Sequence, residues 1–424
     1  MKIPKLNDVK YYKTFKEMID SLCTDETKPA ISWFTRKGEE QGVDYGKLYS
    51  DVLGLKESLC SRGLAGRHIA VLGENSYEWL LVYFATTYCG ATVVCIDVEQ
   101  SDETIEQMLT MADVDAMFCA KQFIDICKKW AIGGRSVFSM QGTDESSMAY
   151  LISEGNRMRQ EGLCIYEEPK VTGETIASIV FTSGTTSFSK PVLLSHEAIL
   201  TNASDALANV AIGKIAFTSL PFYHTYGLTC SVLSMLIGGA KLYINGNLKT
   251  VMRDIKLAGP HTMLTVPLML EAIHRGLWQN AEEAGKADGL RKLLSIRGVL
   301  MSLGVKKCGK TLDAVREKCF GNIKLIICGG AHMNASIMDE FARLGVTVVQ
   351  GYGITECAPL VSVNRNTANK LNSVGLVTPN CEVKIVDGEI LVRGKNLMSG
   401  YYKSPEMTAE AMADGWFKTG DMGE

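Results

Sequence analysis

The chain has 424 residues, of which 46% are hydrophobic and 21% charged, and its formal net charge is −3. This length exceeds what a single hydrophobic core usually organises, so we expect two or more subdomains. The composition is that of an ordinary soluble globular protein. The small net charge and the lack of a basic block argue against nucleic acid as a partner.

The thirteen cysteines are scattered, form no C-x-x-C pair and are odd in number. This pattern favours reduced thiols over a disulfide framework, and no zinc spacing is present. The N-terminal segment, Met1–Lys5, lacks the apolar core of a signal peptide. We therefore expect a cytoplasmic protein.

In chain order, a short strand is expected over Arg67–Leu72. The uncharged run Trp79–Ile96 that follows is just long enough to suggest a membrane span. Its β-branched second half and the internal Gly90 instead favour a buried helix, a turn and a strand. We expect no transmembrane segment here.

A further strand is predicted over Ile176–Phe181, followed by a polar loop and the apolar run Val192–Leu194. Ser195 is placed to cap a helix that begins near His196. Farther along, strands are predicted over Ile323–Cys328 and 346–349, with a helix between them that Asn334 caps and Gly345 ends. This alternation predicts βαβ units and parallel sheets covered by helices.

The polar loop after Ile176–Phe181 has the chemistry of a polyphosphate site. Glycine permits close backbone approach, hydroxyl and backbone N–H groups donate, and a lysine supplies charge. It is not a Walker loop, because Ser189 precedes the lysine and Pro191 follows it. An isolated loop of this composition is as often a plain surface loop. The candidate residues are Thr182, Ser183, Gly184, Thr185, Thr186 and Lys190.

Two later regions differ in character. Between Leu268 and Gly321 the pattern predicts a charged helical insertion, most of it a solvated excursion. The segments 382–386 and 389–393 alternate with a period of two around Asp387-Gly388, which predicts a hairpin. We divide the chain into a large α/β region, residues 1–370, and a β-rich subdomain, residues 371–424.

Further motifs occur downstream of the polar loop in a characteristic order: Leu220–His224, Gly329–Ala331, Gln350–Glu356 and Thr419–Asp421. From about Tyr45 to Glu424 the chain therefore resembles the adenylate-forming superfamily of acyl-CoA synthetases, luciferases and peptide-synthetase adenylation domains. The resemblance implies an α/β fold of stacked, predominantly parallel sheets with a small barrel-like β-rich subdomain. It also implies that ATP activates a carboxylate as acyl-AMP, with pyrophosphate released.

The resemblance assigns roles to individual residues around ATP. The polar loop would hold the β- and γ-phosphates, although Ser187 and Pro191 stand where the family often has glycine. Tyr352, between Gly351 and Gly353, would stack on adenine, and Asp421 would bind the ribose hydroxyls. Gly330 and Ala331 would lie beside adenine and the acyl pocket. Thr355 would bind the α-phosphate, and Glu356 would be the Mg²⁺ ligand. Lys190 and His224 would take part in catalysis, with His224 at the substrate carboxylate.

Within the superfamily, the insertion after Val266-Pro267 and the segment 328–333 resemble long-chain acyl-CoA synthetases. A medium- or long-chain fatty acid is the expected substrate and CoA the expected thiol; an aryl acid is not excluded. Apolar residues near Gly227 suffice for an acyl tunnel or for a plain core. Two alternatives stay open: an adenylation domain that loads a carrier protein, and a binding module without turnover.

The family's smaller C-terminal domain follows a hinge close to Glu424, and no segment of this chain is assigned to that domain. We expect a truncated large domain with impaired adenylation, because the family's C-terminal lysine contacts the reacting groups. Peripheral membrane contact and oligomeric state are left open by the sequence.

Overall fold

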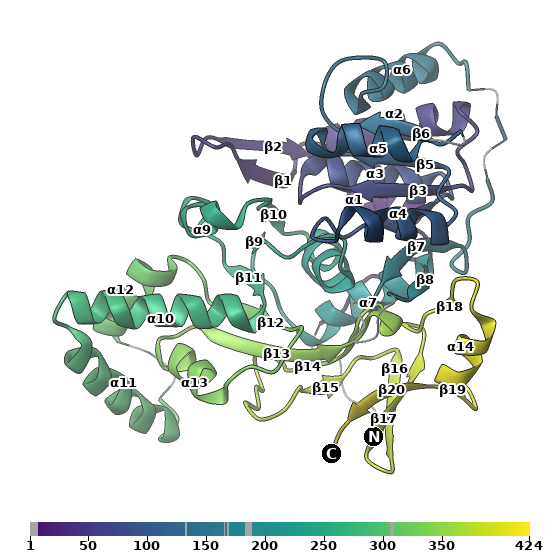
Figure 1. Ribbon diagram of the computed structural model, residues 1–424. Helices are drawn as coiled ribbons and strands as arrows, with labels where there is room; N and C mark the ends of the chain where they lie inside the picture. The colour runs from purple at the N-terminus through teal and green to yellow at the C-terminus, as the bar shows by residue number, and fades with distance from the viewer. Residues whose placement is uncertain (1–6, 132–133, 165, 168, 183–188, 306–308) are drawn as a thin grey trace.

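The computed structural model describes residues 7–131, 134–164, 166–167, 169–182, 189–305 and 309–424 (Figure 1). Three sheets organise these residues, with seven, nine and four strands. The mixed α/β architecture, with large and mostly parallel sheets and a small antiparallel one, confirms the predicted fold class. The division at residues 370 and 371 stays a prediction.

The seven-stranded sheet forms the upper part of the molecule in Figure 1. The strands from β7 to β6 are parallel to one another. At the other edge, β8 runs antiparallel to β7, and β18 runs antiparallel to β8. Its order is β18 (Gly400–Tyr401), β8 (Pro191–Ser195), β7 (Ile176–Phe181), β4 (Thr92–Cys95), β3 (His68–Leu72), β5 (Ala116–Cys119) and β6 (Ser136–Ser139).

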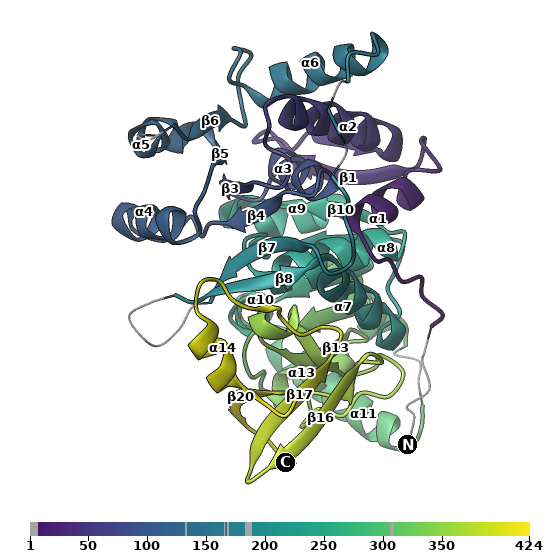
Figure 2. The same cartoon turned by 90° about the vertical axis from the view of Figure 1, so that its right-hand side faces the viewer.

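Helices cover both faces of this sheet because its strands are apolar on both sides. Ala70 and Val94 pack with α4 and α5 on one face, while Ile69 and Val93 belong to the core with α2 and α3 on the other. Figure 2 shows the sheet between these two groups. The helices are α1 (Phe15–Leu22), α2 (Tyr45–Ser61), α3 (Tyr77–Tyr88), α4 (Asp102–Met111), η1 (Lys121–Phe123), α5 (Ile124–Trp130) and α6 (Met148–Gln160).

The nine-stranded sheet is parallel from β13 to β1 and has antiparallel strands at both edges. Its order is β15 (Leu376–Val377), β14 (Leu360–Val363), β13 (Thr347–Gly353), β12 (Leu325–Cys328), β11 (Thr262–Thr265), β9 (Ile215–Thr218), β10 (Lys241–Ile244), β1 (Pro29–Phe34) and β2 (Glu40–Asp44). Its helical segments are α7 (His196–Asn209), η2 (Tyr226–Leu233), α8 (Ser234–Ile237), η3 (Leu248–Thr250), α9 (Val251–Ala258), α10 (Pro267–Glu283), α11 (Ala287–Ser302), α12 (Lys310–Phe320), α13 (Ala335–Arg343) and η4 (Thr355–Cys357).

One large hydrophobic core joins the two big sheets through the helices between them. Trp79 of α3 meets Phe222 edge-on, with ring centroids 5.6 Å apart. Phe15 of α1 packs edge-on against His196 at the start of α7, at 5.3 Å. The two large sheets therefore share a continuous packed layer, which fixes their relative position.

The four-stranded antiparallel sheet lies at the lower edge of the molecule and includes the C-terminal segment (Figure 1). The predicted hairpin is confirmed: Asp387 and Gly388 both have positive φ, at 52° and 86°, as a tight two-residue turn requires. The sheet contains β16 (Cys381–Val386), β17 (Glu389–Gly394), β20 (Trp416–Met422) and β19 (Met412–Ala413), and α14 (Pro405–Ala411) precedes β19.

Several local predictions agree with the structure. Ser195 and Asn334 cap α7 and α13 through their side chains, as expected. The run Trp79–Ile96 forms most of α3, a turn at Gly90 and β4, which confirms the helix–turn–strand prediction. Across the described residues, no helix combines the length and apolarity needed to cross a membrane.

Two predicted strands differ in extent from the structure. The strand expected from Ile323 begins at Leu325, two residues later. The strand expected over 346–349 continues as β13 to Gly353, so Tyr352 and its flanking glycines lie in a strand rather than beyond one. The reason is β14, which turns back and pairs with this extension: Tyr352 is opposite Ser362.

Candidate active site

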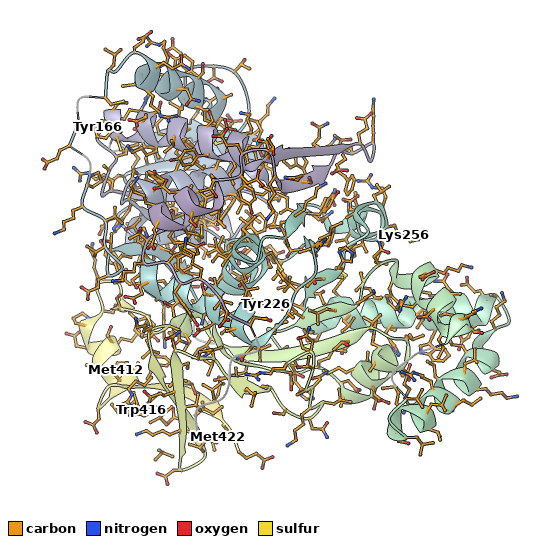
Figure 3. The ribbon with its side chains drawn as sticks, turned by 180° about the vertical axis from the view of Figure 1, so that it is seen from behind. Tyr166, Tyr226, Lys256, Met412, Trp416 and Met422 are labelled. Atoms are coloured by element: carbon orange, nitrogen blue, oxygen red, sulfur yellow. The ribbon has the colours of Figure 1, made fainter. Side chains whose placement is uncertain are left out.

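An apolar cavity of about 350 Å³ lies where the predicted motifs converge. Residues of the Leu220–His224, Gly329–Ala331 and Gln350–Glu356 motifs line it together with α7 and η2. Figure 3 shows Tyr226, one of the lining residues, near the middle of the molecule, with Met412, Trp416 and Met422 on the β-rich sheet to one side. The structure thus brings three separately recognised segments to one cavity.

The aromatic and the carboxylate expected at the nucleotide lie in direct contact. The Tyr352 hydroxyl donates to Asp421 Oδ2 at 2.6 Å, although the two residues belong to different sheets. Burial, and then the Asp421 carboxylate, raise the pKa of Tyr352, so its hydroxyl stays a donor. Tyr352 is half-buried at the cavity, whereas Asp421 is exposed and has a free face for a diol.

Gly353 is required by a close backbone approach. A Cβ at this position would lie 2.2 Å from the carbonyl oxygen of Pro359. The bulge between Tyr352 and Gly353 in the pairing with β14 creates this approach. The glycine therefore lets the strand turn into η4, which carries Thr355 and Glu356 beside the cavity.

Glu356 is held by a tyrosine that sequence reasoning did not select. The Tyr401 hydroxyl donates to Glu356 Oε1 at 2.8 Å, and the Lys190 Nζ lies 5.3 Å from the centroid of the Tyr401 ring. Burial, and then Glu356, raise the pKa of Tyr401, so the phenol remains protonated. Tyr401 thus contacts the expected metal ligand through its hydroxyl and the expected phosphate lysine through the face of its ring.

Two buried amides fix the backbone next to Glu356. Asn202 of α7 donates to the carbonyl oxygens of Leu360 (2.7 Å) and Cys357 (3.3 Å) and accepts from Leu360 N–H at 3.0 Å. Asn396 donates to the same two carbonyls, at 3.3 and 3.2 Å. A sequence signal existed for Asn202, because it interrupts the apolar face of α7, where buried polar groups need partners.

The polar loop is described only at its two ends. Thr182 N–H donates to the Lys190 carbonyl at 3.1 Å, and Lys190 N–H donates to Thr182 Oγ1 at 3.4 Å. These two hydrogen bonds join the two ends of the β7–β8 connection, and Thr182 lies beside His224. Four predicted phosphate ligands, Ser183, Gly184, Thr185 and Thr186, lie outside the described residues.

His224 lies between the apolar cavity and the base of the polar loop. It lines the large cavity, and with Thr182 and Ser189 it also lines a small adjoining one of about 20 Å³. Burial lowers the pKa of His224, although Asp97 opposes this shift. A neutral imidazole that can donate one hydrogen bond therefore stands at the junction of the two cavities.

The helical segment η2 shapes the apolar end of the cavity. Its wide, π-type turns begin at Tyr226, whose hydroxyl donates to the carbonyls of Ile327 (3.1 Å) and Thr265 (3.3 Å). Gly227 allows this packing, since a Cβ there would be 1.9 Å from the Pro221 carbonyl oxygen. Such π-type turns are frequent at functional sites.

The Gly329–Ala331 segment contributes unequally to the site. Gly329 and Gly330 line the cavity, and a Cβ at Gly329 would touch the Tyr226 ring at 3.1 Å. Ala331 is exposed and is not among the lining residues. The backbone at Gly329-Gly330, not the side chain of Ala331, therefore borders the cavity.

A metal ion would have few protein ligands here. Among the described residues, no group of three or more His, Cys, Asp or Glu side chains could hold one. Glu356 offers a carboxylate that accepts a hydrogen bond from the Tyr401 hydroxyl. This donor set fits Mg²⁺ that takes most of its oxygens from a bound phosphate and water.

A profile of the AMP-binding enzymes matches residues 23–402. The chain belongs to the AMP-binding enzyme family. This result confirms the resemblance to adenylate-forming enzymes that the ordered motifs indicated.

Curated relatives include long-chain acyl-CoA synthetases of Arabidopsis thaliana. Long chain acyl-CoA synthetase 5 is 26% identical over 90% of this chain and 64% of its own length. Long chain acyl-CoA synthetase 7, a peroxisomal protein, is 27% identical over 91% of this chain and 60% of its own length. The chain therefore spans less than two thirds of the length of these relatives.

Solved structures share the fold at low sequence identity. VinN in complex with L-aspartate superposes with a TM-score of 0.77 at 21% identity, covering 99% of this chain and 97% of VinN. ATP-bound MatB from Rhodopseudomonas palustris gives 0.74 at 21% identity, covering 97% of this chain and 76% of MatB. These similarities support the architecture, and the substrate must be argued from the cavity.

Proposed function

We propose that this protein activates a medium- or long-chain fatty acid with ATP, forming acyl-AMP and pyrophosphate, and that the CoA thiol then takes the acyl group and releases AMP. The observation that carries the proposal is the junction of two unlike regions: an apolar cavity, and a polar rim that carries Tyr352, Asp421, Glu356 and Lys190.

The polar rim suits a nucleoside triphosphate. Asp421 can accept hydrogen bonds from both ribose hydroxyls, and Tyr352 beside it offers a ring to adenine. Lys190 and the hydroxyls of the polar loop would meet the β- and γ-phosphates, with Thr355 at the α-phosphate. Glu356 would hold Mg²⁺, which would supply charge neutralisation at the phosphate oxygens.

In the proposed first step, one oxygen of the fatty acid carboxylate attacks the α-phosphorus of ATP. A bond forms between that oxygen and phosphorus, and the bond from phosphorus to the oxygen bridging the α- and β-phosphates breaks, so pyrophosphate leaves with the electron pair. Neutral His224 would donate a hydrogen bond that orients the carboxylate. Lys190 would offset the charge that develops on pyrophosphate.

The lining of the cavity favours a simple acyl chain. The described lining residues include no lysine, arginine, aspartate or glutamate. The lining includes apolar residues of α7 and the following segment, among them Leu207, Val210 and Ile212. A charged side group on the substrate would be buried there without a partner, at a cost of several kcal/mol. This argues against a dicarboxylate or an amino acid and for a fatty acid.

The direct test is fatty-acid-dependent ATP–pyrophosphate exchange by the protein at its naturally encoded length. We expect exchange with medium- or long-chain fatty acids, and little with acetate, malonate or L-aspartate. Product analysis with CoA and with a phosphopantetheinylated carrier protein then distinguishes the acceptors. Exchange driven by aspartate alone, or by no acid in the panel, would overturn the proposed substrate class.

A further inference from the structure

The helix α11 carries two separate apolar faces. A surface helix of a globular protein normally has one, turned towards the core. Leu290 and Leu294 form the inner face and are buried, at 7% and 4% exposure. On this side α11 packs on α13, where a Cβ at Gly298 would touch the Arg343 guanidinium at 2.9 Å. The inner face therefore accounts for how α11 is attached.

The second apolar face points to solvent. Ile296, Val299, Leu300 and Leu303 follow the spacing of one helical stripe and are 59%, 62%, 37% and 74% exposed. We call these four residues the outer stripe. Single exposed apolar residues are common on protein surfaces, but a contiguous row marks an interaction site.

Along the chain, the charged residues next to the outer stripe are of one sign. The sequence from 289 to 312 contains no aspartate or glutamate. Exposed Lys292 lies one turn before Ile296 on the same face, and the structure shows no ion pair for it among the described residues. Arg291, by contrast, is paired with Asp288 and Glu282. Exposed Lys310 follows the stripe along the chain, and Lys292 and Lys310 are its flanking lysines.

The surface is also sterically accessible. Figure 1 shows α10, α11 and α12 at the end of the molecule opposite the β16–β20 sheet, away from the seven-stranded sheet. The helix α10 starts at Pro267, next to the cavity-lining Val266, and its 17 residues extend about 25 Å outward. The outer stripe is thus separated from the nucleotide rim, and a flat partner can reach it.

We propose that the outer stripe and its flanking lysines dock the protein on an anionic lipid bilayer. An apolar helix face edged by basic residues matches the boundary between acyl chains and anionic headgroups, where each nearby lysine adds attraction. A second copy of this chain fits less well. The stripe is basic at both ends, so parallel and antiparallel pairing would both bring lysines together.

The test is sedimentation with vesicles, using the protein at its naturally encoded length. We expect binding to vesicles of phosphatidylcholine and phosphatidylglycerol, much weaker binding to phosphatidylcholine alone, and loss of binding at about 1 M salt, where the Debye length is about 3 Å. The double variant Ile296→Ser, Leu303→Ser should bind the anionic vesicles at least about tenfold more weakly than the parent. Lys292→Glu should also weaken binding.

The matched control is Leu248→Ser with Met252→Ser, two exposed apolar residues of η3 and α9 at 64% and 44% exposure. This control should bind vesicles like the parent, and all variants should keep parental pyrophosphate exchange in vesicle-free solution. Failure of the parent to bind anionic vesicles, or parental binding by the stripe variant, would overturn the proposal. A parental dimer that the stripe variant dissociates would assign the surface to a second copy instead.

Discussion

The two ends of the candidate site are built in different ways. The proposed nucleotide end joins residues of three sheets through hydrogen bonds: Asp421 from β20, Tyr352 from β13 and Tyr401 from β18. The proposed acyl end is an apolar cavity, lined by residues of the nine-stranded sheet and the helices on it. The first end depends on a few specific contacts, so single substitutions should damage it severely. The second depends on shape, so substitutions there should alter selectivity.

The largest effect is expected at Glu356. In Glu356→Gln the amide oxygen can still accept the Tyr401 hydrogen bond, but the negative charge is lost. The rate of pyrophosphate exchange should therefore fall about 10²-fold or more, and the exchange should lose most of its dependence on Mg²⁺. The control is Glu406→Gln, an exposed carboxylate on α14. An Mg²⁺ titration that is the same in Glu356→Gln and parent would remove Glu356 from the metal site.

The helix α7 is common to both ends, since Asn202 supports the loop at Glu356 and Leu207 lines the acyl cavity. Its first residue, His196, accepts the Phe15 N–H on Nδ1 at 3.1 Å, and burial lowers its pKa to about 4. Protonation of Nδ1 would break that bond. Below about pH 6.5 the unfolded chain therefore binds a proton that the folded protein does not.

The free energy of unfolding should accordingly decrease as the pH falls from about 6.5 to about 4, with His196 contributing up to about 3 kcal/mol of the loss. In His196→Asn the side-chain oxygen can still accept from Phe15, but nothing titrates. Urea unfolding across this pH range should show a flatter profile for the variant. Parallel profiles would mean that His196 is not the titrating group.

At the proposed ribose position, Asp421→Ala should weaken the binding of both ATP and AMP by about 1–3 kcal/mol, because both ligands carry the same diol. Lys190→Ala should weaken the binding of ATP and leave the binding of AMP nearly unchanged, since AMP lacks the phosphates that this lysine would meet. Calorimetry with the two nucleotides separates these cases. Unchanged AMP affinity in Asp421→Ala would place the ribose elsewhere.

The smallest effect concerns chain length at the acyl end. Ile212, Leu207 and Val210 line both the apolar cavity and a second cavity of about 310 Å³ beside Lys10. Ile212 thus stands between the two. Ile212→Trp should shift the preferred fatty acid to shorter chains, by about tenfold in relative kcat/KM, and Ile212→Ala to longer ones. The neighbouring Ala211 lines the second cavity but not the apolar one, so Ala211→Ser should leave the preferred fatty acid chain length unchanged.

Much of the fold follows from local sequence signals. The strand Ile176–Phe181, the Ser195 cap and the Asp387-Gly388 hairpin each depend on residues within a few positions, and the structure contains all three. The same holds for the motif segments that converge on the cavity. Their order along the chain identified the family, although no pairwise distance could be derived from it.

Long-range contacts were not predictable in this way. Tyr401 reaches Glu356 because β18 pairs with β8, with Tyr401 opposite Val192 across more than two hundred residues of sequence. The two-residue strand has no periodicity that would reveal this pairing. The acyl lining was equally hidden, because residues such as Leu207 and Val210 have the same apolar character whether they border a cavity or a packed core.

The central claim is that one ligand occupies both ends of the site. Calorimetry with dodecanoyl-sulfamoyl adenosine, a stable mimic of a fatty acyl-adenylate, tests it directly. We predict that this compound binds at least about 10²-fold more tightly than AMP, since transition-state and intermediate mimics gain from both ends. Asp421→Ala and Ile212→Trp should each reduce that advantage. If the mimic bound no more tightly than AMP, the cavity and the nucleotide rim would not form a single adenylation site.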